Sequence, residues 1–147
     1  EKQYLLKIIP NIWPVSGAVA VAYQTQFDSF RGNGEPLRGV WFNASPNASV
    51  MSTAPGVVTE IGYQKRFGLY IWVEHPIGIR TFYSHLERVQ VSVGESVKKG
   101  RVIGTVGRTG QISSNMLYYE IHIGTVAYNP HAFLNHLQSL WLNPPNP

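Results

Sequence analysis

Apolar and polar residues alternate in short stretches along this chain, and glycine or proline stands at most of the boundaries between them. The pattern is clearest in segment 81–107. There, valines alternate with polar residues over 89–93, a period of two that predicts a half-buried strand. Gly94 and Gly100 mark turns before the next predicted strand, at 102–106. Because glycine adopts positive φ at little cost, these corners indicate a chain that reverses direction repeatedly. Short strands joined in this way predict an all-β sandwich or barrel.

The rest of the chain extends the same pattern. Residues 24–36 are polar and contain glycine and proline, which predicts a loop. Residues 1–9 carry an apolar lead-in whose periodicity does not separate strand from helix. Asn129 and Pro130 fit the N-cap and first position of a short C-terminal helix that ends near residue 140. Further strands are predicted at 18–23, 39–43, 50–53, 57–63, 69–75, 79–86 and 116–123.

Length and composition bound the domain organisation. The chain has 147 residues, of which 44% are hydrophobic, and this is enough for the core of one domain. We place that domain at 13–140. It follows a lead-in at 1–12, which could be the end of an upstream segment, and precedes a proline-rich tail at 141–147.

The composition also narrows the chemistry. The chain has no cysteine, which excludes disulfides and thiolate metal sites. Its formal charge of +4 is mild; it is compatible with an anionic cell envelope, although a solvated basic face is the usual interpretation. No nucleic-acid partner is expected. No apolar run approaches the roughly 20 residues of a membrane helix, so membrane contact is expected only through segments outside this chain. Five basic residues near the glycine turns are expected to form a solvated rim, with contact to anionic envelope polymers as the alternative: Arg88, Lys98, Lys99, Arg101 and Arg108.

The turn pattern at 94–104 reads Gly-x-x-Val-x-x-Gly-x-x-Ile-Gly. It resembles the motif shared by lipoyl- and biotinyl-carrier domains and by the lysostaphin/LytM-type zinc endopeptidases. The carrier interpretation requires an exposed lysine flanked by Asp or Met, and Lys98 and Lys99 lack that flank. The Tyr-Ser-His-Leu segment at 83–86 and matching segments over roughly 13–134 favour the peptidase family. The resemblance implies a compact antiparallel β-sandwich or barrel-sandwich hybrid of the LytM type, with the short C-terminal helix.

Active members of that family hold one zinc ion through a His-x-x-x-Asp pair and the second histidine of a His-x-His strand. Alignment with these motifs places the three ligand positions at Leu37, Trp41 and Tyr118, and one catalytic histidine position at Met116. A second catalytic histidine is retained as His85. Zinc requires nitrogen, oxygen or sulfur donors, at about 2.0–2.2 Å for imidazole and carboxylate. Leucine and tryptophan offer none, and a neutral phenol is a poor ligand. We therefore predict no zinc or other cofactor and a degenerate, non-catalytic member of the family.

The same positions define a candidate binding groove made of Leu37, Trp41, His85, Met116 and Tyr118. These large, mostly apolar side chains would either plug the old cleft or line an aromatic trough that recognises a partner. His85 would be either a relic held by packing or a hydrogen-bonding group in the groove. We expect alanine at Trp41 or Tyr118 to abolish binding without unfolding the domain.

The other polar residues near the groove have structural interpretations. Glu120 and His122 share a strand face with Met116 and Tyr118. A displaced metal site is disfavoured, because His122 lies roughly 13 Å beyond position 118. Glu120 is expected to be a structural carboxylate. His75, at a strand end before a proline, is expected to make a turn hydrogen bond.

Three functions remain open from the sequence. The favoured one is a bacterial pseudopeptidase that binds and regulates an envelope protein, such as a cell-wall hydrolase or a scaffold. The second is a non-catalytic peptidoglycan-binding module, and the third is a residual cell-wall peptidase. All three imply an extracytoplasmic location, in the periplasm or cell envelope, which follows from the resemblance alone.

Overall fold

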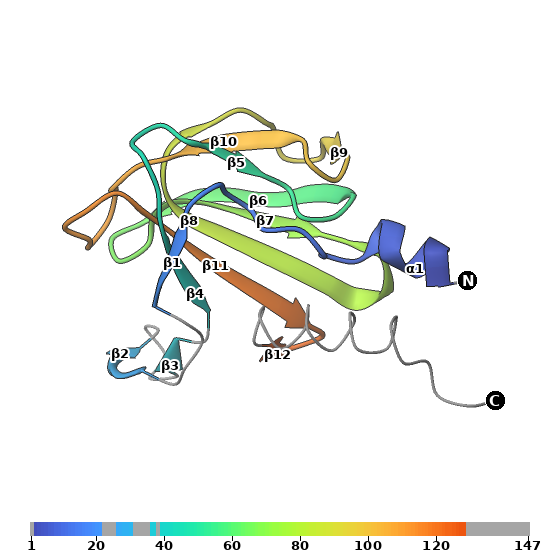
Figure 1. The fold of residues 1–147 in the computed structure, drawn as a ribbon, viewed down its shortest axis with the longest axis horizontal. Helices are drawn as coiled ribbons and strands as arrows, with labels where there is room; N and C mark the ends of the chain where they lie inside the picture. Colours follow the sequence, from blue (N-terminus) through green and yellow to red (C-terminus); the bar gives the residue numbers. More distant parts are fainter. Residues whose placement is uncertain (1, 22–25, 31–35, 38, 129–147) are drawn as a thin grey trace.

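The computed structural model describes residues 2–21, 26–30, 36–37 and 39–128 of the chain (Figure 1). Within them lies one antiparallel sheet, in which seven strands run in the order β1-β4-β11-β8-β7-β6-β9. Strand β10 pairs with both β8 and β5, and β12 pairs with β11, while β2 and β3 form a separate small sheet. The predicted all-β antiparallel fold is therefore confirmed. The predicted helix at 130–140 lies outside the described residues.

The bounds are α1 Lys2–Ile8, β1 Ala18–Val21, β2 Gln26–Phe30, β3 Pro36–Leu37, β4 Val40–Asn43, β5 Ser49–Met51, β6 Gly56–Gln64, β7 Gly68–Glu74, a 3₁₀ turn at Pro76–Gly78, β8 Ile79–Val89, β9 Ser96–Val97, β10 Val102–Val106, β11 Met116–Ile123 and β12 Val126–Tyr128. The long central strands match their predicted positions closely, and β11 matches its prediction at both ends.

The core lies on one face of the sheet, where β5 and β10 fold over it (Figure 1). Side chains alternate along each strand, so every second residue of β7, β8 and β11 points into this core. The contributors include Ile71, Val73, Tyr83, Leu117, Tyr119 and Ile121, with Val50, Ile103 and Val106 on the covering strands. The opposite face of β4, β11, β8 and β7 carries a second set of large side chains, described below.

Two sequence predictions are wrong in detail. The strand predicted at 89–93 does not form, because β8 ends at Val89 and the chain then bends toward β6. Within the segment, the Gln90 amide donates to the Ile103 carbonyl at 2.8 Å. Just after it, the Gly94 amide donates to the Val58 carbonyl at 2.7 Å. Val89 and Val91 are half-buried against the main core, whereas Val93 is exposed. The segment 24–36, predicted as a loop, contains β2 and the start of β3.

The lead-in forms helix α1, whose last turn is anchored to the domain. Ile8 and Ile9 are buried in the main core. The Lys99 ammonium donates to the Leu6 carbonyl at 2.6 Å and also to the Asn11 side-chain oxygen. A cation bonded to the free carbonyls of a helix C-terminus stabilises them directly. Lys99 therefore anchors α1 to the domain and is not part of a solvated rim. Partial burial lowers the pKa of its ammonium group.

No helix of the described residues is long and apolar enough to cross a membrane.

Replacing Lys99 by methionine keeps the apolar stem and removes the donor. We expect Lys99→Met to lower the free energy of unfolding by about 1–2 kcal/mol, because the Leu6 carbonyl and Asn11 oxygen lose a charged partner. Limited proteolysis should cut α1 first. Lys98→Met is the matched control, since Lys98 is exposed. Equal stability and equal cleavage of the two variants would show that Lys99 does not anchor the helix.

Candidate aromatic groove

The face of the sheet opposite the core carries a continuous set of aromatic rings. They come from the turn before β7 and from four neighbouring strands, β4, β11, β8 and β7. We call this set the aromatic face. Its members are Trp41, Phe67, Tyr70, Trp72, Phe82 and Tyr118. Three of them, Phe67, Phe82 and Tyr118, are buried, and the other three are half-buried.

Strand register brings the rings together. Trp41 on β4 lies directly opposite Tyr118 on β11, and their ring centroids are 4.7 Å apart. Trp72 on β7 lies opposite Phe82 on β8, with centroids 4.8 Å apart. Phe67 bridges the set and stacks on Tyr118 at 5.8 Å and an interplanar angle of 13°. Aromatic pairs at these distances are stabilising beyond the area that they bury.

Tyr118 is the centre of the aromatic face. Its side chain is 0% exposed, and its hydroxyl donates to the Glu120 carboxylate. The backbone of Gly39 packs against the ring so closely that a Cβ at this position would lie 2.7 Å from it. Only glycine permits that approach. The phenol is therefore enclosed on several sides and its one proton is already used.

Glu120 is buried between two donors. It is 0% exposed, and besides the Tyr118 hydroxyl it accepts a hydrogen bond from His122 Nε2 at 2.7 Å. A buried carboxylate requires such partners, since an unpaired one is strongly disfavoured. The interpretation of Glu120 as a structural carboxylate agrees with this geometry. His122 in turn packs edge-on against Trp72 at 5.1 Å, and the Arg80 guanidinium lies 4.8 Å from the Trp72 ring centre.

His85 is held at the end of the aromatic face beside Trp41, whose ring stacks on the imidazole at 5.2 Å. Its Nδ1 lies 2.7 Å from the Thr109 carbonyl. Because a carbonyl only accepts, Nδ1 carries the proton and Nε2 presents a lone pair. That Nε2 is buried without a partner among the described residues. Burial lowers the pKa of His85, so the neutral ring is favoured.

The backbone of His85 is also unusual. Its φ is 63°, in the left-handed region that costs a residue with a side chain roughly 1–3 kcal/mol. Two backbone bonds hold it there: its amide donates to the Phe67 carbonyl at 2.8 Å, and its carbonyl accepts from Gly107 at 3.1 Å. Strain of this kind persists only when the surrounding structure fixes it, and it is enriched at functional sites.

The structure brings together Trp41, His85 and Tyr118, three of the five predicted groove residues. Met116 lies two residues before Tyr118 on β11, half-buried and opposite Asn43. Leu37 lies on β3, in the small separate sheet, and its side chain is outside what the structure describes. The two expectations for the groove, a plugged cleft and an aromatic trough, each describe part of it. Tyr118 fills the interior, whereas Trp41 remains half-exposed.

Sequence reasoning missed four members of the aromatic face: Phe67, Tyr70, Trp72 and Phe82. A signal was present, because Tyr70 and Trp72 alternate on β7 and so share one face. The apolar composition of the stretch by itself predicts only a central strand. Its alternation of aromatic and aliphatic residues is what distinguishes the two faces.

These side chains do not fit a zinc ion. The Trp41 indole is a donor only, and the Tyr118 oxygen is enclosed and bonded to Glu120. Among the residues that the structure describes, no three His, Asp or Glu side chains lie close enough to hold a metal.

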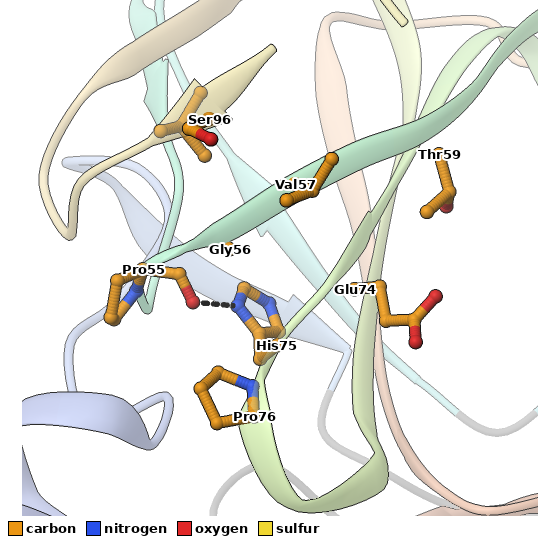
Figure 2. A pocket seen from close by; sticks show the side chains of 9 residues that line it. Pro55, Gly56, Val57, Thr59, Glu74, His75, Pro76 and Ser96 are labelled. Carbon is orange, nitrogen blue, oxygen red and sulfur yellow. Dashed lines mark hydrogen bonds between the residues drawn. The ribbon is translucent and has the colours of Figure 1, made fainter. Parts of the chain in front are cut away.

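His75 lies away from the aromatic face, at the end of β7, and makes the predicted hydrogen bonds. Its backbone amide donates to the Ile79 carbonyl at 2.8 Å across the turn. Nδ1 donates to the Pro55 carbonyl at 2.9 Å (Figure 2), and Nε2 lies 2.7 Å from the Thr81 hydroxyl. Burial lowers the pKa of His75 to about 4.

The fold is that of a LytM/lysostaphin-type domain. The catalytic domain of lysostaphin from Staphylococcus simulans superposes with a TM-score of 0.69 and 25% identity, over 92% of this chain and 98% of that one. The model of peptidase family M23 matches residues 35–130. The chain therefore belongs to peptidase family M23.

Curated relatives agree with this assignment. An uncharacterized metalloprotease of Haemophilus influenzae is 37% identical over 100 residues, which is 67% of this chain and 21% of the relative. The murein hydrolase activator EnvC of Escherichia coli is 32% identical over 123 residues, 83% of this chain and 28% of the relative. The chain thus spans between a fifth and a third of the length of these relatives.

The buried histidines predict acid sensitivity. The unfolded chain protonates His75 near its ordinary pKa of 6.5, whereas the folded protein does so only near 4. The free energy of unfolding should therefore fall as the pH drops from 6.5 through 4, by about 3 kcal/mol for this residue. His85 contributes in the same direction.

Denaturant unfolding between pH 7 and pH 4 measures this effect. His75→Gln can keep a donor to Pro55 and does not titrate, so the variant should show a flatter pH dependence than the parent protein. An equally steep dependence in the variant would mean that His75 is not responsible.

Proposed function

We propose that this chain is a non-catalytic M23 domain that binds a protein partner through its aromatic groove, in the service of bacterial cell-wall or envelope processes. The observation that carries the proposal is the packing of Tyr118. The resemblance assigns this position to a metal ligand, and here its ring is enclosed by Trp41 and Phe67 while its hydroxyl bonds Glu120. A site arranged in this way offers no activated water.

The groove has the properties of a protein-binding surface. Trp41, Tyr70 and Trp72 are half-exposed above a buried floor of Phe67, Phe82 and Tyr118, and Arg80 lies against Trp72. Tryptophan, tyrosine and arginine are the residues that contribute most to protein–protein binding. Because the floor is already packed, little side-chain entropy would be lost on association.

The relatives suggest the class of partner. The Escherichia coli relative is named a murein hydrolase activator. We therefore propose that the partner here is a cell-wall hydrolase or an envelope scaffold and that the domain works outside the cytoplasm. Binding would regulate the partner, and no bond in peptidoglycan would be broken by this chain.

Half-exposed aromatic rings also support a second candidate, a peptidoglycan-binding module. Rings such as Trp41 and Trp72 provide flat apolar surfaces with a polar edge, and these suit a sugar or peptide strand as well as a protein. Purified sacculi separate the two proposals, because the module would sediment with them and the regulator would require its protein partner.

Trp41 is the residue to change. We expect Trp41→Ala to weaken binding to the cognate envelope hydrolase by tenfold or more, since a central tryptophan contributes about 2 kcal/mol or more. Surface plasmon resonance against the purified envelope hydrolases of the same organism measures this loss. Tyr118→Ala, which the sequence suggested as an equivalent test, is unsuitable, because Tyr118 is fully buried and its removal leaves a cavity and takes one hydrogen bond from Glu120.

Tyr4→Ala is the matched control, because Tyr4 is an exposed aromatic residue on α1, outside the groove. Equal partner binding by Trp41→Ala and the parent protein would reject the groove as the binding surface. Release of soluble fragments from peptidoglycan by the parent protein would reject the non-catalytic assignment itself.

A further inference from the structure

The outer edge of β6 is open over part of its length. At its start the edge is occupied by β9 and by segment 94–95, which exchanges backbone hydrogen bonds with Val58. Over 60–64, β6 pairs with β7 on one side and with no strand on the other, within the part of the chain that the structure describes. Natural proteins usually cover or disrupt a free strand edge, because its unpaired backbone groups recruit other strands.

Two residues of this open stretch turn their backbone groups outward. Gln64 and Gly68 are the last pair before the turn that joins β6 to β7, and a pair that closes so short a turn exchanges its backbone hydrogen bonds. The direction alternates along a strand, so Gly62 also bonds toward β7, whereas Ile61 and Tyr63 point their amides and carbonyls away from it. The open edge therefore offers two donors and two acceptors.

A second copy of the same stretch matches these groups. In an antiparallel pair centred on Gly62, Ile61 of each copy lies opposite Tyr63 of the other copy. Both are hydrogen-bonded pairs, so four backbone bonds form and every outward amide and carbonyl is used. At the centre Gly62 lies opposite Gly62, where the two Cα atoms are only about 4.5 Å apart. The pairing spans 60–64 and leaves segment 94–95 in place.

The side chains on one face of this pair also fit each other. Tyr63 is 67% exposed in the single domain, whereas Ile61 is half-buried against the main core. In the pair, each Tyr63 ring covers Ile61 of the other copy. An aromatic residue directly opposite a β-branched residue stabilises an antiparallel ladder, so the pairing gives the exposed tyrosine a partner.

The charges of the stretch favour a second copy over an unrelated strand. Glu60 lies at its start, and Lys65 and Arg66 follow its end. Antiparallel self-pairing therefore brings the acidic end of each copy beside the basic end of the other, and it does so twice. Within the described residues, none of these three side chains makes an ion pair, although the Glu60 carboxylate accepts a hydrogen bond from the Tyr70 hydroxyl.

We propose that the open edge of β6 is a self-association site, at which a second copy of this chain pairs antiparallel about Gly62 and forms a two-fold dimer. Residues directly opposite each other in a ladder share a face of the sheet. Gly62 lies opposite Tyr70 of the aromatic face, so the aromatic faces of both copies lie on the same side of one continuous sheet. The dimer thus presents two grooves in one direction, and bivalent binding raises avidity without any new contact.

The contact is small. It covers roughly 17 Å of strand in each copy, and such an edge buries less than the roughly 1,200 Å² of a stable protein–protein interface. The dimer is therefore expected to be transient and to depend on concentration. Self-association itself does not rest on the proposed groove function.

Sedimentation equilibrium of the parent protein, from micromolar to millimolar concentration, measures the association. We expect a reversible equilibrium between monomer and dimer. Isotope-filtered NOE spectra of mixed labelled and unlabelled protein then identify the contact. We expect intermolecular NOEs between the Gly62 Hα atoms and between the Tyr63 ring and the Ile61 side chain. A protein that stays monomeric at millimolar concentration, or a dimer without these NOEs, would overturn the proposal.

Charge variants test the self-complementarity. Glu60→Lys and the double variant Lys65→Glu/Arg66→Glu should each raise the dissociation constant of the dimer about tenfold, because two attractive contacts become repulsive. An equimolar mixture of the two variants should associate at least as tightly as the parent protein, since basic and acidic ends meet again. Glu87→Lys is the matched control, because Glu87 is exposed on β8 and lies outside the open edge.

Unchanged association of the charge variants, or a mixture that associates no better than either variant alone, would contradict the proposed pairing. Trp41→Ala should dimerise like the parent protein, because Trp41 lies on β4. Weaker dimerisation of this variant would place the contact in the groove and overturn the proposal as well.

Discussion

The pairing of β8 with β11 is the constraint on which both faces of the domain depend. The two strands pair without a register shift from Tyr118 opposite Ser84 to Ile123 opposite Ile79. Because side chains alternate, this register directs Leu117, Tyr119 and Ile121 into the core and Tyr118, Glu120 and His122 to the other face. A slip of one residue would exchange the two sets. The core therefore fixes the groove: burying one set determines where the other set lies.

The polar side chains of the groove face bond to one another. Glu120 would be costly to bury alone, and it is paired with the Tyr118 hydroxyl and His122. The Tyr118 ring is covered by Trp41 and Phe67. The Tyr118 hydroxyl, the Glu120 carboxylate and His122 Nε2 are thus already used in hydrogen bonds to one another. The outer rings, Trp41, Tyr70 and Trp72, are half-exposed, and the proposed binding function depends on them.

Much of this could be predicted from the sequence. Strands such as β7 and β11 are long enough to show periodicity, and glycine marks their boundaries, so their positions were correct. Short strands such as β3, with two residues, carry no periodic signal. The segment 89–93 shows how periodicity misleads: its valines alternate, but its backbone bonds lead away to Ile103 and Val58. Local pattern does not encode such long-range partners.

The candidate site, like the fold, could be predicted only in part. Motif spacing identified Trp41, His85 and Tyr118, because a shared glycine and a Tyr-Ser-His-Leu segment set the register with a known family. It did not show that Tyr118 is buried and bonded to Glu120, since burial depends on Phe67 and Phe82 from other strands. The left-handed backbone of His85 could not be predicted from the sequence either, because it follows from hydrogen bonds to Phe67 and Gly107.

Zinc binding tests the central claim most directly. The purified protein is incubated with zinc, dialysed and subjected to elemental analysis, with the catalytic domain of lysostaphin as the positive control. Our account predicts less than about a tenth of an equivalent of bound zinc, because Trp41 and Tyr118 supply no available donor. One equivalent of zinc retained after dialysis would contradict it, and would mean that other residues of the chain form a metal site.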